Sequence, residues 1–236
     1  MTDEDRSLRE LRSEAVEDFL KAVYMLQQEH ELVPTTLLAQ SLNITPPSVT
    51  DMAKKLSDTE RLREPLLVVK PYRGVHLTPL GEQIALEVLR HHRLLELYLV
   101  EALGYSWDEV HDEADRLEHH ISERFEARIA EVLGNPIIDP HGDPIPTVEG
   151  KLLGQEHLHP LAEWPQEKPG VVVRFLDQAP EKLQYFEEKG LKPGAIIQIT
   201  KREPFDGLIH VLIDATLHVL SQSTTESILI AESPAR

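Results

Sequence analysis

Histidines and carboxylates recur at helical spacing in the middle of the chain, between residues 91 and 120. Residues four, seven or eight positions apart share one face of an α-helix, and the spacing predicts such a face on each of two consecutive helices. Imidazole and carboxylate donors together suit a divalent cation of borderline to hard character. The candidate ligands here are His92 and Glu96 on the first helix, and His111, Asp115, Glu118 and His119 on the second.

A helix face rich in Glu and His is more often plain solvated surface than a metal site. The second helix also carries an apolar stripe at Val110, Ala114, Leu117 and Ile121, which is typical of a helix with one core face and one wet face. The choice between a metal site and solvated surface therefore depends on the neighbouring parts of the chain.

The composition excludes several classes of site and of protein. The chain has 236 residues and no cysteine, which excludes disulfides and thiolate ligands. Its net charge is −17, and residues 81–160 hold 17 acidic against 6 basic side chains, so cations should collect there while nonspecific binding to nucleic acid should be weak. No apolar stretch approaches the ~20 residues that cross a bilayer. The polar N-terminus does not resemble a signal peptide, so we expect a cytoplasmic protein without a membrane partner.

Residues 1–78 read as a winged helix-turn-helix domain. A helix from Ser13 to about His30 carries Asp18 beside its apolar face, and a short helix follows over residues 35–41. A third helix is opened by Thr45, a good N-cap, and by two prolines that fit a first turn. Residues 66–77 predict a two-stranded wing. A generic packing domain with the same elements is the alternative.

The outer face of the third helix is small, polar and basic, as in a helix that reads the major groove. Asp51 is an acceptor-only group that suits a cytosine amino group, whereas Lys54 and the wing residue Arg73 suit phosphates. The expected DNA-binding residues are Thr45, Pro47, Ser48, Thr50, Asp51, Lys54 and Arg73.

Residues 79–150 are expected to form a helical domain. A long helix over residues 78–103 precedes a second one over residues 107–133, and together they carry more apolar surface than two helices can bury alone. We therefore expect a homodimer. The Asp139-Pro140-His141-Gly142 turn offers two further oxygen and nitrogen donors.

Residues 151–169 are rich in proline and read as a stiff linker. Short strands separated by turns then follow over residues 170–236, with a helix at residues 180–188 and a hairpin turn at Asp206-Gly207. This pattern predicts a small SH3-like barrel.

The order of these parts resembles the diphtheria-toxin-repressor family of metal-dependent transcription regulators, in its three-domain form. The resemblance covers almost the whole chain, and its most specific motifs are HHRLLE, VHDEADRLEHH, DPHGDPIP, PPSVTDMAKKL and GLKPG. It implies a mainly α fold with small β: a winged helix-turn-helix, a helical dimerisation domain and an SH3-like (FeoA-type) β-barrel.

The resemblance also implies two metal sites. The primary one is similar to a site built from Asp18, Asp115, Glu118 and His119, with His92 belonging to it or to its neighbour. The second resembles either an ancillary site of His92, Glu96 and His111, or the site of manganese-type members. That second form would use Glu96, Asp139, His141 and a barrel carboxylate, for which Asp177 is the candidate.

This chain departs from each branch of the family at specific positions. Iron-type members carry Met and Cys where this chain has Asp18 and Asp115. Two-domain manganese members carry Glu where this chain has Lys21. The barrel ligands of iron-type members fall near Ala179 and Lys182, which cannot ligate in the same way.

Oxygen and imidazole ligands favour Mn²⁺, with Fe²⁺ or Co²⁺ as the alternatives. The expected function is therefore a non-enzymatic regulator that binds palindromic operator DNA as a metal-loaded dimer and controls metal-uptake genes. Two other classes fit part of the pattern. A metallohydrolase lacks support because no catalytic motif accompanies the ligands, and a metal-independent winged-helix regulator would use the barrel to bind a ligand or a protein.

Overall fold

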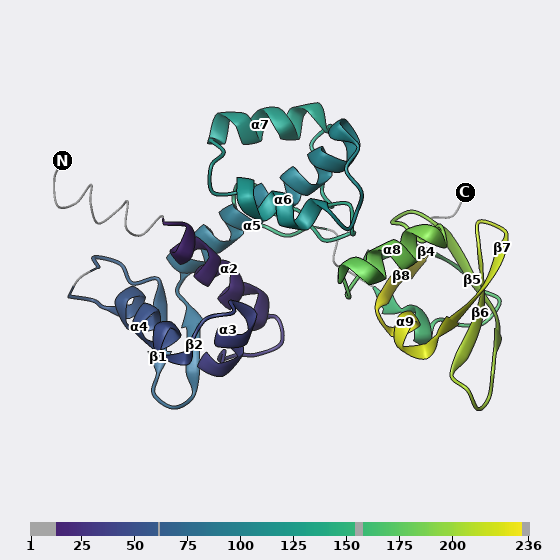
Figure 1. Ribbon diagram of the computed structural model, residues 1–236, viewed down its shortest axis with the longest axis horizontal. Helices are drawn as coiled ribbons and strands as arrows, with labels where there is room; N and C mark the ends of the chain where they lie inside the picture. Colours follow the sequence, from purple (N-terminus) through teal and green to yellow (C-terminus); the bar gives the residue numbers. More distant parts are fainter. Residues whose placement is uncertain (1–12, 61, 154–157, 233–236) are drawn as a thin grey trace. The chain divides into compact units, whose positions relative to one another are not determined.

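The computed structural model describes residues 13–60, 62–153 and 158–232, which form two compact units (Figure 1). The first unit contains the N-terminal residues up to His91 together with Glu118–His120 and Val148–Lys151. The second unit contains the other described residues. No helix within the described ranges has the length and apolar character needed to cross a bilayer.

The first unit contains the predicted winged helix-turn-helix. Its elements are α2 (Glu14–Gln27), α3 (Thr35–Ser41), α4 (Pro46–Ser57), β1 (Leu67–Lys70) and β2 (Gly74–Leu77). The two strands pair antiparallel to form the wing, which lies beside α3 and α4 in Figure 1. Thr45 caps α4 as predicted, because its side-chain oxygen accepts a hydrogen bond from the Ser48 backbone N–H at 3.4 Å. Ser13 precedes α2 as predicted but makes no side-chain cap.

The helices of this unit bury one apolar face each, which holds their outer faces at fixed positions. Phe19 and Leu20 of α2 and Leu56 of α4 are almost completely buried. Burial of one such side chain contributes roughly 1.5–3 kcal/mol. The buried positions recur at helical spacing in both helices.

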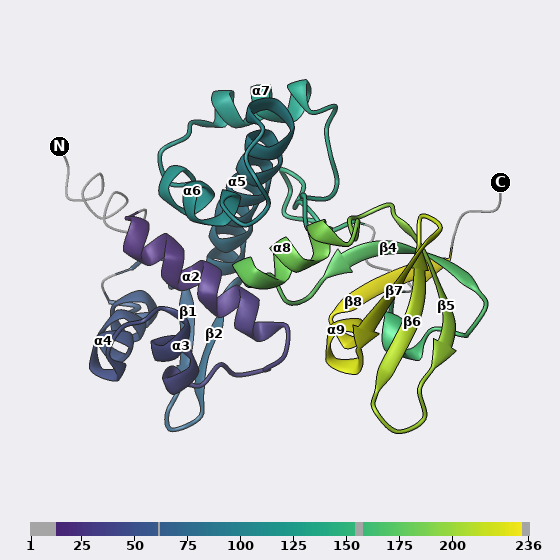
Figure 2. The same ribbon diagram turned by 45° about the vertical axis from the view of Figure 1, so that its right-hand side comes forward.

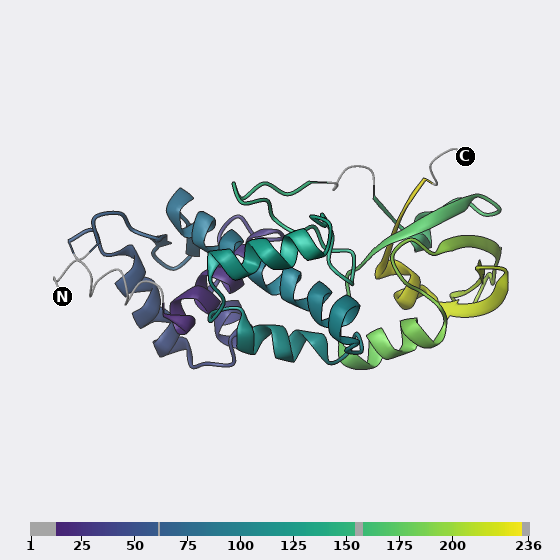
Figure 3. The ribbon, with the colours of Figure 1, turned by 90° about the horizontal axis from the view of Figure 1, so that it is seen from above.

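The helix α5 (Pro79–Leu103) matches the predicted long helix. The predicted single helix over residues 107–133 is wrong, because the structure has α6 (Val110–Leu117) and α7 (Glu123–Val132) instead. Ser122 starts the second of these by accepting a hydrogen bond from the Phe125 N–H at 3.3 Å. The C-terminal half of α5 lies between α6 and α7 in Figure 3, and Leu94, Ala114 and Ile129 meet in their shared core.

The C-terminal part is an antiparallel six-stranded sheet in the order β3-β8-β4-β5-β6-β7. Its strands are β3 (His159–Pro160), β4 (Pro169–Phe175), β5 (Ile196–Arg202), β6 (Leu208–Ile213), β7 (Thr216–Ser221) and β8 (Ile228–Glu232), with the helices α8 (Pro180–Glu188) and α9 (Gln222–Glu226). Figure 2 shows β4 beside β8 and the β6–β7 hairpin at the sheet edge. The sheet encloses an apolar core around Phe175 and Phe186, whose rings stack 4.6 Å apart.

The segment assigned to a linker, residues 151–169, differs in part from that assignment. His159–Pro160 is already a strand that pairs with β8, and the next residues form a short 3-10 helix, Leu161–Glu163. Leu161 and Trp164 are buried in the core of the sheet. These large apolar side chains outweigh the local effect of the prolines, so the barrel begins about ten residues earlier than its strand pattern indicates.

Candidate metal centres and DNA-binding face

An N-terminal cluster, which we define as Asp18, Glu118 and His119, joins the first helix of the winged unit to the turn after α6. Its potential ligand atoms all lie within 4.8 Å of one another. Nε2 of His119 is 2.9 Å from Oδ1 of Asp18 and 3.3 Å from Oε1 of Glu118. Three donors of the predicted primary site therefore meet around one point, although Asp18 is about a hundred residues from the other two in the chain.

Glu17 is a member of this site that the sequence analysis missed. Its Oε2 lies 2.6 Å from Nδ1 of His119, on the opposite side of the ring from Asp18. Burial lowers the pKa of His119, but the hydrogen bonds to Asp18 and Glu17 and the charge of Glu118 more than reverse this and raise it to about 10. With a metal on Nε2, Glu17 would instead accept a hydrogen bond from the Nδ1 proton. A carboxylate is a usual hydrogen-bond partner for the second ring nitrogen of a ligating histidine.

Lys21 fills part of the same site. Its Nζ lies 2.5 Å from Oε1 of Glu118, whose side chain is completely buried. The ammonium thus neutralises a carboxylate that a cation would otherwise bind. A metal at the N-terminal cluster has to share Glu118 with Lys21 or displace it.

Asp115 does not join this cluster on the helix face that the sequence predicted. The helix α6 ends at Leu117, so Glu118 and His119 lie in the following turn, and the i+7 and i+8 argument is wrong for them. The ring nitrogen Nδ1 of His91 lies 3.1 Å from the Glu118 carbonyl oxygen and satisfies that end of the helix. Glu118 and His119 do lie beside Asp18, but a turn and not a helix face brings them there.

The structure instead groups Asp115 with His92 and His111, which we call the outer cluster. Oδ1 of Asp115 lies 3.2 Å from Nδ1 of His92, and its Oδ2 lies 3.7 Å from Nε2 of His111. The side chains of His111 and Asp115 are about half exposed, at 57% and 47%. The grouping differs from the predicted primary site, which included Asp115.

A buried cluster adjoins the outer one through Glu96, and consists of Glu96, Asp139 and His141. These residues are only 2%, 3% and 1% exposed. Oε1 of Glu96 contacts His92 and His111 at 3.0 and 3.2 Å, while its Oε2 lies 3.9 Å from Nδ1 of His141. Three of the four residues predicted for the manganese-type second site therefore lie together, without the barrel candidate.

Burial acts differently on the three groups of the buried cluster. It raises the pKa of Asp139, and the nearby charges of Glu96 and Asp143 raise it further against the opposing effect of Arg93. Burial also lowers the pKa of His141, and the charge of Glu96 opposes this shift. For Glu96 burial opposes ionisation, but the imidazole of His92 and the hydrogen bonds from His111 and His92 dominate, so its pKa is below its usual range.

The residues of the buried cluster fit a divalent cation. Among the described residues, neither ring nitrogen of His141 has a hydrogen-bond partner, although a buried polar atom without one costs about 1–3 kcal/mol. A neutral imidazole with a free lone pair, next to two carboxylates, is the donor set of a borderline-to-hard metal ion. A bound cation would satisfy the imidazole and both charges at once.

Asp177, the predicted barrel ligand, is not brought into the buried cluster. Its Oδ1 accepts a hydrogen bond from the Ala179 N–H at 3.3 Å, just before α8. The neighbouring Gln178 points toward the cluster instead and donates to Asp143 Oδ2 at 2.5 Å. The sequence analysis did not mark Gln178, and it included Asp143 in the DPHGDPIP motif without giving it a role.

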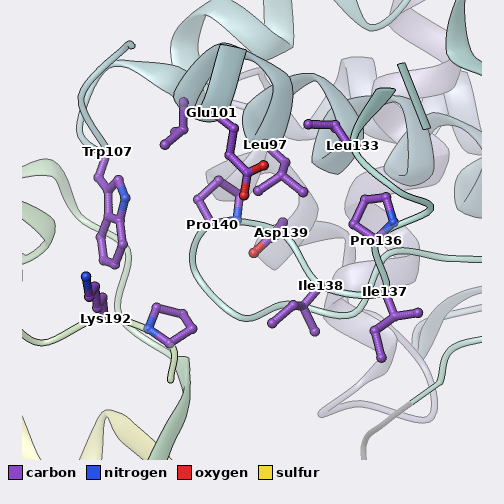
Figure 4. Close-up of a pocket in the computed structure, with 12 residues that line it drawn as sticks. Leu97, Glu101, Trp107, Leu133, Pro136, Ile137, Ile138, Asp139, Pro140 and Lys192 are labelled. Atoms are coloured by element: carbon purple, nitrogen blue, oxygen red, sulfur yellow. The ribbon is translucent and has the colours of Figure 1, made fainter. Parts of the chain in front are cut away.

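A cavity of about 350 Å³ borders the buried cluster (Figure 4). Its walls are mostly apolar, with Leu97 and Glu101 of α5 on one side and Trp107 on another. The Trp107 ring also stands edge-on to the His141 ring, at 5.9 Å between centroids. Asp139 lines the cavity as well, so the buried cluster borders this cavity directly.

The DNA-binding residues predicted on α4 are exposed, as a reading face requires, and Arg73 is exposed at the wing. Three of them make local hydrogen bonds. Thr45 and Ser48 share a hydrogen bond of 2.9 Å between their hydroxyls, and Thr50 donates its hydroxyl to the Pro46 carbonyl at 3.0 Å. Asp51 and Lys54 project from the same exposed face.

Comparison with known proteins accounts for most of the described chain. Residues 12–75 match the DNA-binding domain of iron-dependent repressors, residues 78–147 match their metal-binding and dimerisation domain, and residues 159–232 match the FeoA domain. The iron-dependent repressor IdeR of Mycobacterium bovis is 36% identical over 172 residues, covering 70% of this chain and 73% of the relative. The diphtheria toxin repressor of Corynebacterium efficiens is 34% identical over 143 residues, covering 61% of this chain and 60% of that protein.

Solved structures agree with the sequence relatives. A manganese-dependent transcriptional repressor in complex with manganese superposes with a TM-score of 0.79 at 34% identity, covering 92% of this chain and 99% of that one. The repressor ScaR with bound Cd²⁺ gives 0.71 at 33% identity, with the same coverage. The family is one of transcriptional repressors and not of enzymes. The chain belongs to the diphtheria-toxin-repressor family of metal-dependent transcriptional repressors.

Proposed function

We propose that this protein is a manganese-activated repressor that binds palindromic operator DNA as a homodimer and controls genes of metal uptake. One observation carries the proposal. The N-terminal cluster ties Asp18 of α2, in the DNA-binding unit, to Glu118 and His119 in the turn beyond α6, at 2.9 and 3.3 Å around the His119 Nε2 atom. A cation held there fixes the first helix of the DNA-binding unit to this turn.

The proposed activation by metal follows from the charges of the residues in the N-terminal cluster. Without a cation, Asp18 lies against His119 and Glu118 lies against Lys21, so the attachment of α2 depends on proton and ammonium contacts. A bound divalent ion supplies stronger positive charge at the same point. DNA binding is then favoured to the extent that the ion binds the DNA-competent arrangement more tightly than the others.

The second site of the proposal is the buried cluster, with His141 as its decisive donor. Oxygen and imidazole donors without sulfur support Mn²⁺, and solved relatives are described with Mn²⁺, Cd²⁺ and Zn²⁺. Fe²⁺ and Co²⁺ should also bind, and more tightly by the usual order of affinities, so selectivity would come from geometry and supply. The outer cluster, half exposed, serves as a weaker neighbour that shares Glu96.

The test is a DNA-binding titration on the DNA upstream of the protein's own gene, by fluorescence anisotropy, in Mn²⁺, in Fe²⁺ and in chelator. Wild type should bind at least tenfold more tightly with Mn²⁺ than with chelator. Asp18→Ala and His119→Ala should remove this difference while the dimer remains folded. Equal affinity of the wild type in Mn²⁺ and in chelator would instead favour a metal-independent regulator.

A further inference from the structure

The turn that supplies Asp139 and His141 is pressed against strand β4 of the barrel. The Phe175 N–H donates to the His141 carbonyl oxygen at 3.0 Å. A β-bulge leaves Val173 outside the pairing with β8, and an ideal Cβ on Gly142 would lie only 1.8 Å from the Val173 carbonyl oxygen. The backbones therefore meet at a distance that only glycine allows.

Asp143 fastens this contact with its side chain. Its Oδ1 lies 3.2 Å from Nε of Arg174, and its Oδ2 accepts the hydrogen bond from Gln178. Both partners belong to the barrel. Inside the turn, the Asp143 backbone N–H donates to Asp139 Oδ1 at 2.9 Å, and the Asp143 carbonyl accepts from the Asp139 N–H at 2.9 Å. One residue thus connects a proposed ligand to the barrel.

Arg93 of α5 supports the same turn from the other side. Its buried guanidinium donates to the Pro144 carbonyl at 2.6 Å. Its Nε is 3.6 Å from Asp139 Oδ2 and its Nη2 is 3.7 Å from Asp143 Oδ1. A fixed positive charge therefore lies between the two carboxylates and offsets part of the cost of burying them.

Among the described residues, no barrel side chain belongs to any of the grouped potential ligands, which come from the helices and the turns. The barrel nevertheless holds the turn through Arg174, Gln178 and the backbone of β4. Figure 4 shows Asp139 and Pro140 of this turn between α5 and the barrel segment that carries Lys192. These contacts indicate that the barrel supports the turn and does not itself supply a metal ligand.

We infer that Asp143 is a positioning residue of the buried cluster: it fastens the 139–143 turn to the barrel and so holds Asp139 and His141 in reach of Glu96. The inference rests on the proposed binding of a metal at this cluster. It makes the barrel a mechanical part of the site, whose attachment sets the metal affinity without supplying a ligand.

The experiment measures Mn²⁺ binding to the full chain by calorimetry, with His141→Ala identifying which class of sites is the buried cluster. Gln178→Ala removes one hydrogen bond to Asp143 and should weaken that class about threefold to tenfold. Asp143→Ala should weaken it more than tenfold, and Asp143→Asn, which keeps one acceptor oxygen, should recover part of the loss. The Mn²⁺ affinity of the N-terminal cluster should not change in any of these variants.

Gln184→Ala is the matched control, because Gln184 also donates to a carboxylate, Asp108, at 2.6 Å, but outside the turn. It should bind Mn²⁺ as the wild type does. Hydrogen exchange at the Phe175 amide gives an independent readout: Mn²⁺ should slow it in the wild type and not in Asp143→Ala.

The outcomes separate the two ideas. If His141→Ala removes a class of sites but Asp143→Ala and Gln178→Ala bind like the wild type, Asp143 does not position the cluster, and the proposed metal site stands. If a loss of affinity in Gln184→Ala equals that in Gln178→Ala, the effect is general loosening of the barrel and the inference is overturned. If His141→Ala removes no class, the proposed site itself is wrong.

Discussion

Nζ of Lys21 lies 2.5 Å from Oε1 of Glu118, so an ammonium group already occupies one side of a carboxylate that we assign to the N-terminal metal site. The side chain of Glu118 is fully buried and that of Lys21 is 18% exposed. Lysine and metal are therefore competitors for the same oxygen. This relationship leads to the first prediction.

Replacing Lys21 with Met should raise the affinity of the N-terminal cluster for Mn²⁺ by about tenfold, which is roughly 1.4 kcal/mol. The metal-free protein should lose about 1–3 kcal/mol of stability, because the buried Glu118 carboxylate loses its ion pair with Lys21. Calorimetry and thermal unfolding in chelator measure the two effects. Lys168→Met is the control, because its ion pair with Glu232 at 2.6 Å is exposed. Weaker Mn²⁺ binding in Lys21→Met would show that the ammonium assists the site.

Mn²⁺ binding at the N-terminal cluster should release about one proton between pH 7 and 9. The pKa of His119 is raised to about 10, so the ring holds a proton that a metal on Nε2 must displace. The affinity should then rise with pH by up to about tenfold per unit and level off near pH 10. Calorimetry in two buffers of different ionisation enthalpy counts the proton, and a count of zero at pH 8 contradicts the assignment.

The same pKa has the opposite consequence for the metal-free protein. A histidine whose folded pKa is raised contributes stability that is complete below its unfolded value of about 6.5. That contribution should be lost as the pH rises through about 10. Urea unfolding in chelator at pH 6 and pH 10 should show the decrease, and His119→Gln should reduce it.

His141→Leu should abolish Mn²⁺ binding at the buried cluster without destabilising the metal-free protein. The imidazole is buried with both nitrogens lacking a hydrogen-bond partner among the described residues, so an apolar replacement removes an uncompensated polar group. Thermal unfolding should show an unchanged or higher midpoint in chelator and a smaller gain on adding Mn²⁺. A drop of several degrees in chelator would mean that the ring makes a stabilising contact in the absence of metal.

Gly142→Ala should destabilise the protein by more than about 3 kcal/mol. Its φ is +89°, and the added Cβ would collide with the Val173 carbonyl. Gly194→Ala is a close control, with φ of +90° and no atom within 4 Å of its Cβ, so it should cost only the conformational strain of about 1 kcal/mol. Equal losses in urea unfolding would remove the close backbone contact from the explanation.

Lys54→Ala should weaken operator binding for all sequences and reduce the slope of log affinity against log salt by about one. Lys54 is exposed on α4, whereas Lys189, which lies over the Tyr185 ring on α8, provides a control on the barrel. Anisotropy titrations at several salt concentrations measure the slope. An unchanged slope in Lys54→Ala removes this residue from the interface.

The sequence by itself determined most of the helices and strands and the chemistry of the donors, but not the break between α6 and α7. Helical periodicity and the Thr45 cap placed α4 correctly, and alternation with turn residues placed the wing, because these features depend on contacts within a few residues. The residue types also predicted metal sites with oxygen and imidazole donors. This prediction needs no tertiary structure, because the donor atoms of a side chain do not depend on the fold.

Only the tertiary structure decided which donors belong together. The end of α6 at Leu117 places Asp115 with His92 and puts His119 beside Asp18, a choice that no helical spacing contains. Glu17, Lys21 and Asp143 gained their roles from residues 97 or more positions away or from the packed barrel. Local sequence patterns cannot predict these contacts between distant residues, because the contacts result from how the whole chain buries its apolar faces.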